Sequence, residues 1–315
     1  MRRVSIAAAL ALAASGAQAA GKDCDHSREC LAGVMTAYLQ ALTQHNPASL
    51  PTTRNVKYTE NGVRLTLGDG LWQTASALPT YRLDVIDDEA GAIGMLGRIS
   101  ENGNNNWYGV RLKVEPDGKV SQIETLVNRS AGGGGGPPGG SKQNTEPHPL
   151  MAQVIPENKR LSRGELARIS NTYFTGLDTS ESSKGIPFSP DCQRRENGTI
   201  TSNNPEAEKG SMVWMDCKSQ FDTGFSVIVT DIRERRFEVV DRTKGLAFAW
   251  AYFDHNGTVA KFTNTPDPNK VSDVAQLFRQ PMTFYIAEVF KIVDGDIRQI
   301  EAVLTTVPYE MESGW

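Results

Sequence analysis

The same β-hairpin pattern occurs twice in this sequence, and the repetition limits the folds that the chain can adopt. Residues 107–127 read WYGVRLKVEPDGKVSQIETLV and residues 284–304 read FYIAEVFKIVDGDIRQIEAVL, each with Asp-Gly between apolar runs and Gln-Ile-Glu afterwards. Asp-Gly favours a tight hairpin turn because glycine tolerates a positive φ angle. The copies superpose without a gap, since the offset that aligns Asp117 with Asp294 also aligns Gln122 with Gln299. We therefore predict a duplicated domain.

The repeat extends upstream of the hairpin. Three further matches pair Glu60-Asn61-Gly62 with Glu196-Asn197-Gly198, Ile86-Asp87 with Val240-Asp241, and Gly91 with Gly245. The segment between the matched Gly and Asp spans 62–87 in the first copy and 198–241 in the second, where it is clearly longer. The second copy therefore carries an insertion before its sheet is complete.

A helix is predicted at the start of each copy. Apolar residues at helical spacing indicate one over residues 27–44. The second begins at Ser162 and Glu165, which have the spacing of a capping box. Each repeat is thus expected to be α+β, with a long helix packed on an antiparallel β-sheet.

Length and composition fit two globular domains. The chain has 315 residues, 39% hydrophobic and 22% charged, and the usual prior is ~150 residues per domain. The boundaries predicted are 20–129 for the first repeat, 130–149 for a Gly/Pro-rich linker and 150–315 for the second repeat. The net charge of −4 gives no reason to expect nucleic acid as a partner. No apolar run after residue 20 is long enough to span a bilayer.

The first residues have the pattern of a cleavable signal peptide. Arg2 and Arg3 precede an apolar run, and Ala17-Gln18-Ala19 is a small-residue cleavage site. Residues 1–19 are therefore expected to be removed, leaving a secreted or periplasmic chain with no membrane segment.

The cysteines are expected to be oxidised in that compartment. Cys24, Cys30, Cys192 and Cys217 allow three pairings, and proximity in the sequence favours Cys24–Cys30 and Cys192–Cys217. A metal site is the competing interpretation, but no C-x-x-C motif or paired histidine spacing supports it. We expect neither a metal nor another cofactor.

The predicted pattern resembles the fold of the nuclear transport factor and ketosteroid isomerase superfamily, which includes SnoaL-like proteins. In this pattern one helix leads into a curved sheet, and the sheet ends with an Asp-Gly turn and an I-x-x-I-E strand. The Glu-Asn-Gly segments, the strand end Asp254-His255 and the tail from Pro308-Tyr309 to Ser313-Gly314-Trp315 are similar to a family of secreted two-repeat proteins without assigned function. That tail usually has Gly after Pro-Tyr, where this chain has Glu310. The resemblance implies two cone-shaped α+β repeats, with an apolar ligand pocket in the cone mouth.

Alternation along residues 246–255 suggests which side chains could line such a pocket. Phe248, Trp250 and Tyr252 share one face with Asp254, whereas Ala247, Ala249 and Ala251 share the other with Phe253 and His255. The aromatic face could bind a flat apolar ligand. The alternative is that it packs on the helix as core, because large aromatics dominate cores.

Glu288, His255, Asp254 and Tyr285 are the candidate catalytic residues, and Asp222 is a further candidate for binding substrate. A glutamate in the middle of an apolar strand is either a buried acid–base group or a residue on a solvated edge. His255 could transfer protons near neutral pH, but adjacent strand residues face opposite sides, so Asp254 would not orient it in a regular strand. Glu124 and Glu301 occur in both copies and are expected to be structural.

Two functions remain open from the sequence. The first is an exported, cofactor-independent lyase, isomerase or hydrolase that acts on a small apolar, aromatic molecule by acid–base catalysis. The second is a non-catalytic module that binds a small molecule or a protein. The segment closed by Cys192–Cys217 could cover the cone mouth, so the site is placed in residues 150–315. The halves are expected to pack as a pseudo-dimer within a monomer.

Three asparagines lie in the Asn-x-Ser/Thr pattern of N-glycosylation. They are Asn128, Asn197 and Asn256. The pattern matters only in a host that glycosylates exported proteins.

Overall fold

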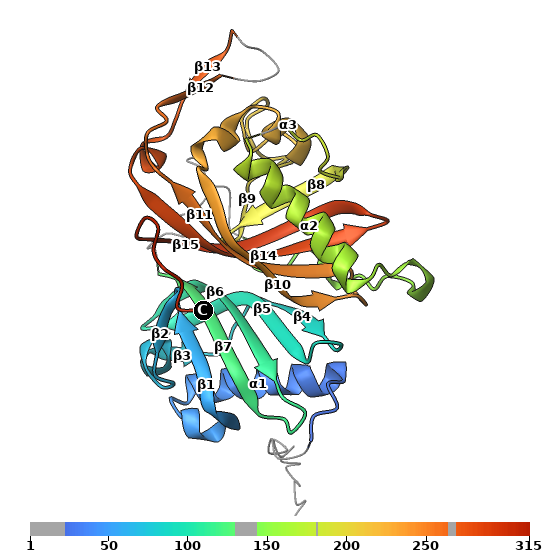
Figure 1. Cartoon of the computed structure of the whole chain (residues 1–315), viewed down its shortest axis with the longest axis vertical. Helices are drawn as coiled ribbons and strands as arrows, with labels where there is room; N and C mark the ends of the chain where they lie inside the picture. The colour runs from blue at the N-terminus through green and yellow to red at the C-terminus, as the bar shows by residue number, and fades with distance from the viewer. Residues whose placement is uncertain (1–22, 130–143, 181, 264–268) are drawn as a thin grey trace, which may run out of the picture.

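The computed structural model describes residues 23–129, 144–180, 182–263 and 269–315 (Figure 1). The predicted signal peptide and residues 130–143 of the predicted linker lie outside the described residues.

Each repeat begins with a helix that leads into a sheet. The first contains α1 (Arg28–Thr43), β1 (Thr52–Glu60), β2 (Val63–Leu65), β3 (Ala75–Ala77), β4 (Arg82–Asp87), β5 (Ala92–Glu101), β6 (Asn104–Val114) and β7 (Val120–Asn128). The second contains α2 (Arg163–Asp178), β8 (Phe188–Glu196), β9 (Thr199–Ile200), α3 (Cys217–Phe221), β10 (Asp231–Asp241), β11 (Leu246–His255), β12 (Lys261–Thr263), β13 (Val271–Asp273), β14 (Met282–Val293) and β15 (Asp296–Val307). The predicted capping box at Ser162 and Glu165 is confirmed at the start of α2.

Both sheets are mixed, which corrects the prediction of purely antiparallel sheets. The first has the order β2-β1-β7-β6-β5-β3 with β4 also paired to β5, and the second has the order β10-β11-β14-β15-β8-β9. The strand that follows each helix region runs parallel to the last strand of its own repeat, β1 beside β7 and β8 beside β15. Alternation of side chains indicates a strand but not the direction of its neighbour, so this pairing could not be read from the sequence.

Buried side chains form three clusters, named here the first core, the second core and the interface core. The first core lies between α1 and the first sheet, and the second core lies between α2 and the second sheet. The interface core contains residues of both sheets and lies where they face each other. The layers are thus helix, sheet, sheet and helix, with α1 and α2 on the outer faces (Figure 1).

Two disulfides connect the pairs Cys24–Cys30 and Cys192–Cys217, which confirms the pairing expected from sequence proximity. The second joins β8 to the first residue of α3. Among the helices described, none is both long enough and apolar enough to cross a membrane.

The register of the repeat differs from the gap-free superposition. Arg111 pairs with Glu124, whereas Val289 pairs with Glu301, so Arg111 corresponds to Val289 rather than to Glu288. The first hairpin has one more residue in its turn region. A slip of one residue reverses the face of every side chain. The counterpart of Glu288 is therefore Val110, not Arg111.

Two reciprocal ion pairs link the repeats. Arg28 at the start of α1 makes a two-pronged contact with Asp241 of the second repeat, at 2.8 and 2.7 Å. Arg163 at the start of α2 contacts Asp87 of the first repeat at 2.6 Å. Each aspartate also accepts a backbone N–H of the opposite repeat, from Ile86 and from Val240. Since Asp87 and Asp241 are buried, these contacts fix how the sheets face each other.

Replacing one arginine of these pairs tests their contribution. In Arg28→Met, Asp241 loses its charged partner while its side chain stays fully buried. We expect the free energy of unfolding to fall by about 2–3 kcal/mol, measured by urea denaturation at pH 7. The matched control is Arg242→Met, which breaks an exposed pair with Glu89 and should cost less than about 1 kcal/mol. Equal losses in the two variants would contradict the structural role of Arg28.

Candidate functional site

Glu288 is a buried carboxyl group in the second core. It lies on β14, with Ala249 of β11 and Ala302 of β15 opposite it on the neighbouring strands. Its side chain is 2% exposed, and its Oε2 atom has no hydrogen-bond partner among the described residues. Burial and, to a smaller extent, the negative charge of Glu196 raise the pKa of Glu288 to about 8, against the opposing effect of the positive charge of Arg194. Glu288 is therefore protonated at neutral pH.

Arg194 forms the centre of a polar network near Glu288. Its Nε forms an ion pair with Glu196 at 2.9 Å and donates to the Thr201 hydroxyl at 3.1 Å. Its two terminal nitrogens donate to the Tyr173 hydroxyl at 3.2 Å and to the Gln220 side chain. The network thus joins β8, α2 and α3 around one guanidinium group.

The Cys192–Cys217 disulfide holds two of these elements together. Cys192 lies two residues before Arg194 on β8, and Cys217 lies three residues before Gln220 on α3. The inserted segment therefore supplies Gln220 to the network, and the disulfide fixes where α3 meets β8.

Sequence reasoning missed Arg194, Glu196, Tyr173 and Gln220. Arg194 and Gln220 lie in a segment whose composition resembles a loop, and Tyr173 has the helical spacing of an ordinary core residue. A usable signal did exist, because the matched Glu-Asn-Gly segments place Arg194 where the first repeat has Tyr58.

The first core differs from the second at the matching positions. Val110 and Met95 pair where the second repeat has Glu288 and Ala249. Ile93 likewise corresponds to Ala247, because each follows the matched aspartate of its own repeat at the same distance along the chain. The first repeat thus fills this region with large apolar side chains, whereas the second combines small side chains with one acid.

The aromatic face of β11 packs against the first repeat rather than against α2. Phe248, Trp250 and Tyr252 belong to the interface core. The Phe248 ring lies so close to Gly94 that a Cβ added to this glycine would overlap the ring. The alanine row faces α2 instead, because small side chains allow the helix to approach and large rings fill the space between the sheets. Sequence alternation separates the two faces but does not say what covers each one.

Tyr285 also lies in the interface core. Its ring stacks on Tyr252 at 4.5 Å, and its hydroxyl donates to Glu124 of the first repeat. Glu124 is fully buried and also accepts from Arg111 and Arg236, which hold its pKa low against the effect of burial. Tyr285 therefore lies on the face of β14 opposite to Glu288.

His255 and Asp254 lie on opposite faces at the end of β11. Asp254 pairs with Arg233 at 2.5 Å and accepts from Thr283. The His255 ring packs 5.2 Å from Phe278 and 5.1 Å from Phe284, and its Nδ1 lies 3.1 Å from the Phe253 carbonyl oxygen. Burial lowers the pKa of His255 to about 4, so the ring is neutral at pH 7.

The structure does not bring His255 and Glu288 together. His255 pairs with Met282, six positions before Glu288 on β14, and a strand rises ~3.4 Å per residue. The two side chains are therefore roughly 20 Å apart along the same face. They do not form one acid–base pair.

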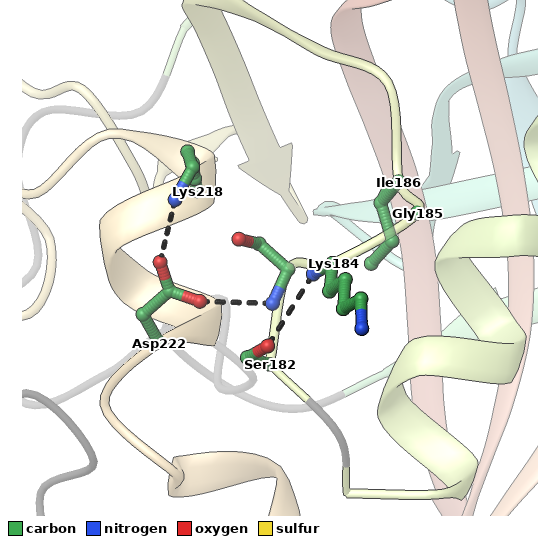
Figure 2. Close-up of a pocket in the computed structure, with 7 residues that line it drawn as sticks. Ser182, Lys184, Gly185, Ile186, Lys218 and Asp222 are labelled. Atoms are coloured by element: carbon green, nitrogen blue, oxygen red, sulfur yellow. Dashed lines mark hydrogen bonds and ion pairs between the residues drawn. The ribbon is translucent and has the colours of Figure 1, made fainter.

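Asp222 lines an open surface hollow of about 630 Å³ beside α3 (Figure 2). Its carboxylate accepts from the Ser183 backbone N–H at 2.9 Å and from Lys218 at 2.8 Å. Neighbouring Phe221 contacts the Tyr173 ring at 5.2 Å, so the hollow lies close to the Arg194 network. Glu288 is not among the lining residues. In the part of the chain that the structure describes, no cluster of three His, Cys, Asp or Glu side chains could hold a metal.

The raised pKa of Glu288 predicts a specific dependence of stability on pH. The folded chain keeps a proton that the unfolded chain releases above about pH 4.5, so the free energy of unfolding should fall as pH rises towards about 8. Glu288→Gln cannot ionise, and at pH 8 it should be more stable than the parent by on the order of 2 kcal/mol. Urea denaturation from pH 5 to 8.5 measures this. Exposed Glu312→Gln is the control, and an unchanged slope in Glu288→Gln would contradict a buried neutral acid.

The lowered pKa of His255 predicts that stability changes with pH in the opposite direction. Below about pH 6.5 the unfolded chain binds a proton that the folded chain excludes until about pH 4, so stability should fall as the solution is acidified through this range. His255→Gln should lose less stability than the parent between pH 6.5 and 4, as measured by thermal unfolding. The control His45→Gln changes an exposed histidine and should follow the parent. A parent-like acid slope in His255→Gln would show that another group is responsible.

Comparison with solved structures finds weak similarities that cover part of the chain. An NTF2-like protein of unknown function from Cytophaga hutchinsonii is 10% identical, with a TM-score of 0.26, covering 31% of this chain and 89% of that one. A de novo designed protein with a curved β-sheet is 16% identical, with a TM-score of 0.27, covering 33% of this chain and 88% of that one. AclR from Streptomyces galilaeus, a proposed hydroxylase, is 14% identical, with a TM-score of 0.29, covering 47% of this chain and 83% of that one. Similarity at this level carries no argument about what this chain does.

Comparison with protein families gives a clearer result. No curated protein matches the chain. One family model matches residues 25–127 and 159–304, which together are more than half of the sequence and fall in both repeats. The chain belongs to the family described as "Domain of unknown function (DUF8021)".

Proposed function

We propose that the second repeat binds a small, largely apolar molecule in its core and that Glu288 exchanges a proton with it. The observation that carries this proposal is the buried Glu288 carboxyl group, whose Oε2 atom has no partner among the described residues. A buried polar atom without a partner destabilises the fold by about 1–3 kcal/mol, so its presence requires an explanation. A ligand that supplies the missing hydrogen bond provides one.

The residues around Glu288 suit proton transfer. At neutral pH the carboxyl group is protonated and can donate, and with a pKa of about 8 it can also take a proton back. The Arg194 guanidinium lies close enough to lower that pKa, and its positive charge would stabilise negative charge that develops on a ligand. Arg194 donates to the Tyr173 hydroxyl oxygen, which leaves the hydroxyl hydrogen for a ligand acceptor. Isomerisation, elimination and hydrolysis can each use an acid–base group and a neighbouring positive charge of this kind.

The sizes of the side chains favour the second repeat over the first as the place where the small molecule binds. Ala249 and Ala302 flank Glu288, whereas Met95 and Thr125 flank Val110 at the matching position. The surrounding walls are apolar, with Phe290 and Phe221 in contact with the Tyr173 ring. An apolar lining with a few convergent polar groups is typical of sites for small molecules.

A non-catalytic binding module is the second candidate. The observation in its favour is that His255 lies far from Glu288, so a second titratable group of suitable pKa does not join it. Binding alone would use the same apolar walls and the Arg194 network.

Export and a monomeric state are parts of the same proposal. The leader pattern of residues 1–19 and the two disulfides favour an oxidising compartment outside the cytoplasm. The interface core already covers one face of each sheet within a single chain, which favours a monomer.

The experiment screens the chain from Ala20 against small aromatic and alicyclic compounds by thermal shift, then assays each binder for turnover. For an enzyme, Glu288→Gln should lower kcat by ~10²–10⁴-fold while binding is retained. The matched control is Glu301→Gln, the same change at a buried acid whose partners are Tyr81, the His148 backbone and Arg195. That control should lose stability without any change in kcat.

A second variant tests whether the ligand occupies the space beside Glu288. Ala249→Met gives the second core the residue that the first core has at this position. If the proposal is correct, the variant folds and no longer binds the compounds. A variant that unfolds would indicate a fully packed core, and one that still binds would move the site elsewhere. Binding without turnover by the parent would favour the non-catalytic module.

A further inference from the structure

The three Asn-x-Ser/Thr sites differ sharply in their surroundings. The side-chain amides of Asn128 and Asn197 both donate to the Leu304 carbonyl oxygen, at 2.8 and 3.1 Å. Both side chains are buried, at 3% and 0% exposure. Asn197 also accepts the Leu304 backbone N–H at 3.1 Å. A glycan on either amide would break these contacts and could not fit in the folded chain.

Asn256 lies in the turn that follows β11 and is partly exposed. Its amide nitrogen donates no hydrogen bond within the described residues, whereas its Oδ1 accepts the Thr258 backbone N–H at 3.0 Å and the Thr258 hydroxyl at 2.7 Å. Thr258 is itself exposed. The amide nitrogen is therefore available, and the hydroxyl that the glycosylation pattern requires is already in contact with the same side chain.

The backbone around Asn256 keeps this turn at the surface. Gly257 has a φ angle of 75°, and an added Cβ there would come within 2.8–2.9 Å of the Gln280 and Pro281 backbone. The backbone at Gly257 is thus packed directly against the backbone of Gln280 and Pro281. Asn256 lies beyond the end of β11, whereas the ion pairs that join the repeats involve Asp241 at the far end of the β10–β11 hairpin. A glycan on Asn256 would therefore lie at the opposite end of the hairpin from the Arg28–Asp241 pair.

We infer that Asn256 is an N-glycosylation site of this protein. The inference rests on the proposed export and on passage through a compartment that holds a lipid-pyrophosphate-linked oligosaccharide and its transferase. In the transfer, the Asn256 amide nitrogen forms a bond to the anomeric carbon of the sugar and loses one proton. The bond from that carbon to the pyrophosphate oxygen breaks, and the lipid pyrophosphate leaves.

The test expresses the full chain in a eukaryotic secretory host, once with its own first residues and once behind an established secretory leader. The secreted protein is treated with peptide N-glycanase in heavy-oxygen water, which converts a glycosylated asparagine to labelled aspartate. Mass spectrometry of the peptides should find the label at Asn256 and not at Asn128 or Asn197. Asn256→Gln and Thr258→Ala should both migrate like the deglycosylated parent, whereas Thr258→Ser should retain a glycan.

The two forms of expression, with the native first residues and with the established leader, distinguish failure of this inference from failure of the proposed export. A glycan at Asn256 behind the established leader, with no secretion from the native first residues, would support the site and overturn the export. A secreted chain with an unmodified Asn256, or with glycans at Asn128 or Asn197 instead, would overturn the site. Because Thr258 is exposed, Thr258→Ala is expected to fold even if Asn256→Gln disturbs the turn.

Discussion

The reciprocal pairs Arg28–Asp241 and Arg163–Asp87 are the contacts on which the relation between the repeats depends. Each joins the start of one repeat's helix to the hairpin of the other, so each contact ties a helix of one repeat to the sheet of the other. These ion pairs hold together two apolar sheet faces that would be exposed to water in an isolated repeat. Phe248, Trp250 and Tyr252, for example, are buried only where the sheets meet. Burying that apolar area provides the driving force, and the buried ion pairs select the orientation.

With one face of each sheet committed to the interface core, only the helix-side faces remain for a site. The two repeats use these faces differently. In the first, Tyr38 and Tyr108 join their hydroxyls at 2.6 Å, and Glu60 is satisfied by the Tyr58 hydroxyl and the Leu71 backbone N–H. In the second, Arg194 replaces Tyr58 and Glu288 replaces Val110. The two copies of one fold therefore differ in what they place between helix and sheet, with an arginine and an acid at these positions in the second repeat only.

Much of the architecture could be predicted from local signals. The Asp-Gly turns, the capping box at Ser162 and the proximity of Cys192 to Cys217 each depend on residues close in sequence. The direction of β1 beside β7 could not be predicted, because pairing depends on residues far apart in the chain. The gap-free superposition, which aligns Arg111 with Glu288, was wrong for a different reason, because one extra residue in the turn of the first hairpin shifts every side chain before it to the other face. For the site, Glu288 stood out as an acid in an apolar strand, whereas Arg194 needed the fold to bring α2, α3 and β8 together.

The contact between Phe248 and Gly94 has a consequence for self-association. The two residues occupy matching positions, since each lies at the same distance along the chain from the matched aspartate of its own repeat, and they touch across the interface between the repeats. In a homodimer of either repeat alone, this place would hold two phenylalanines that overlap or two glycines that leave a void. The pairing therefore works only between unlike halves. Each repeat is therefore an obligatory complement of the other. Two molecules could associate through this surface only by domain swapping, in which the first repeat of one molecule packs on the second repeat of its neighbour.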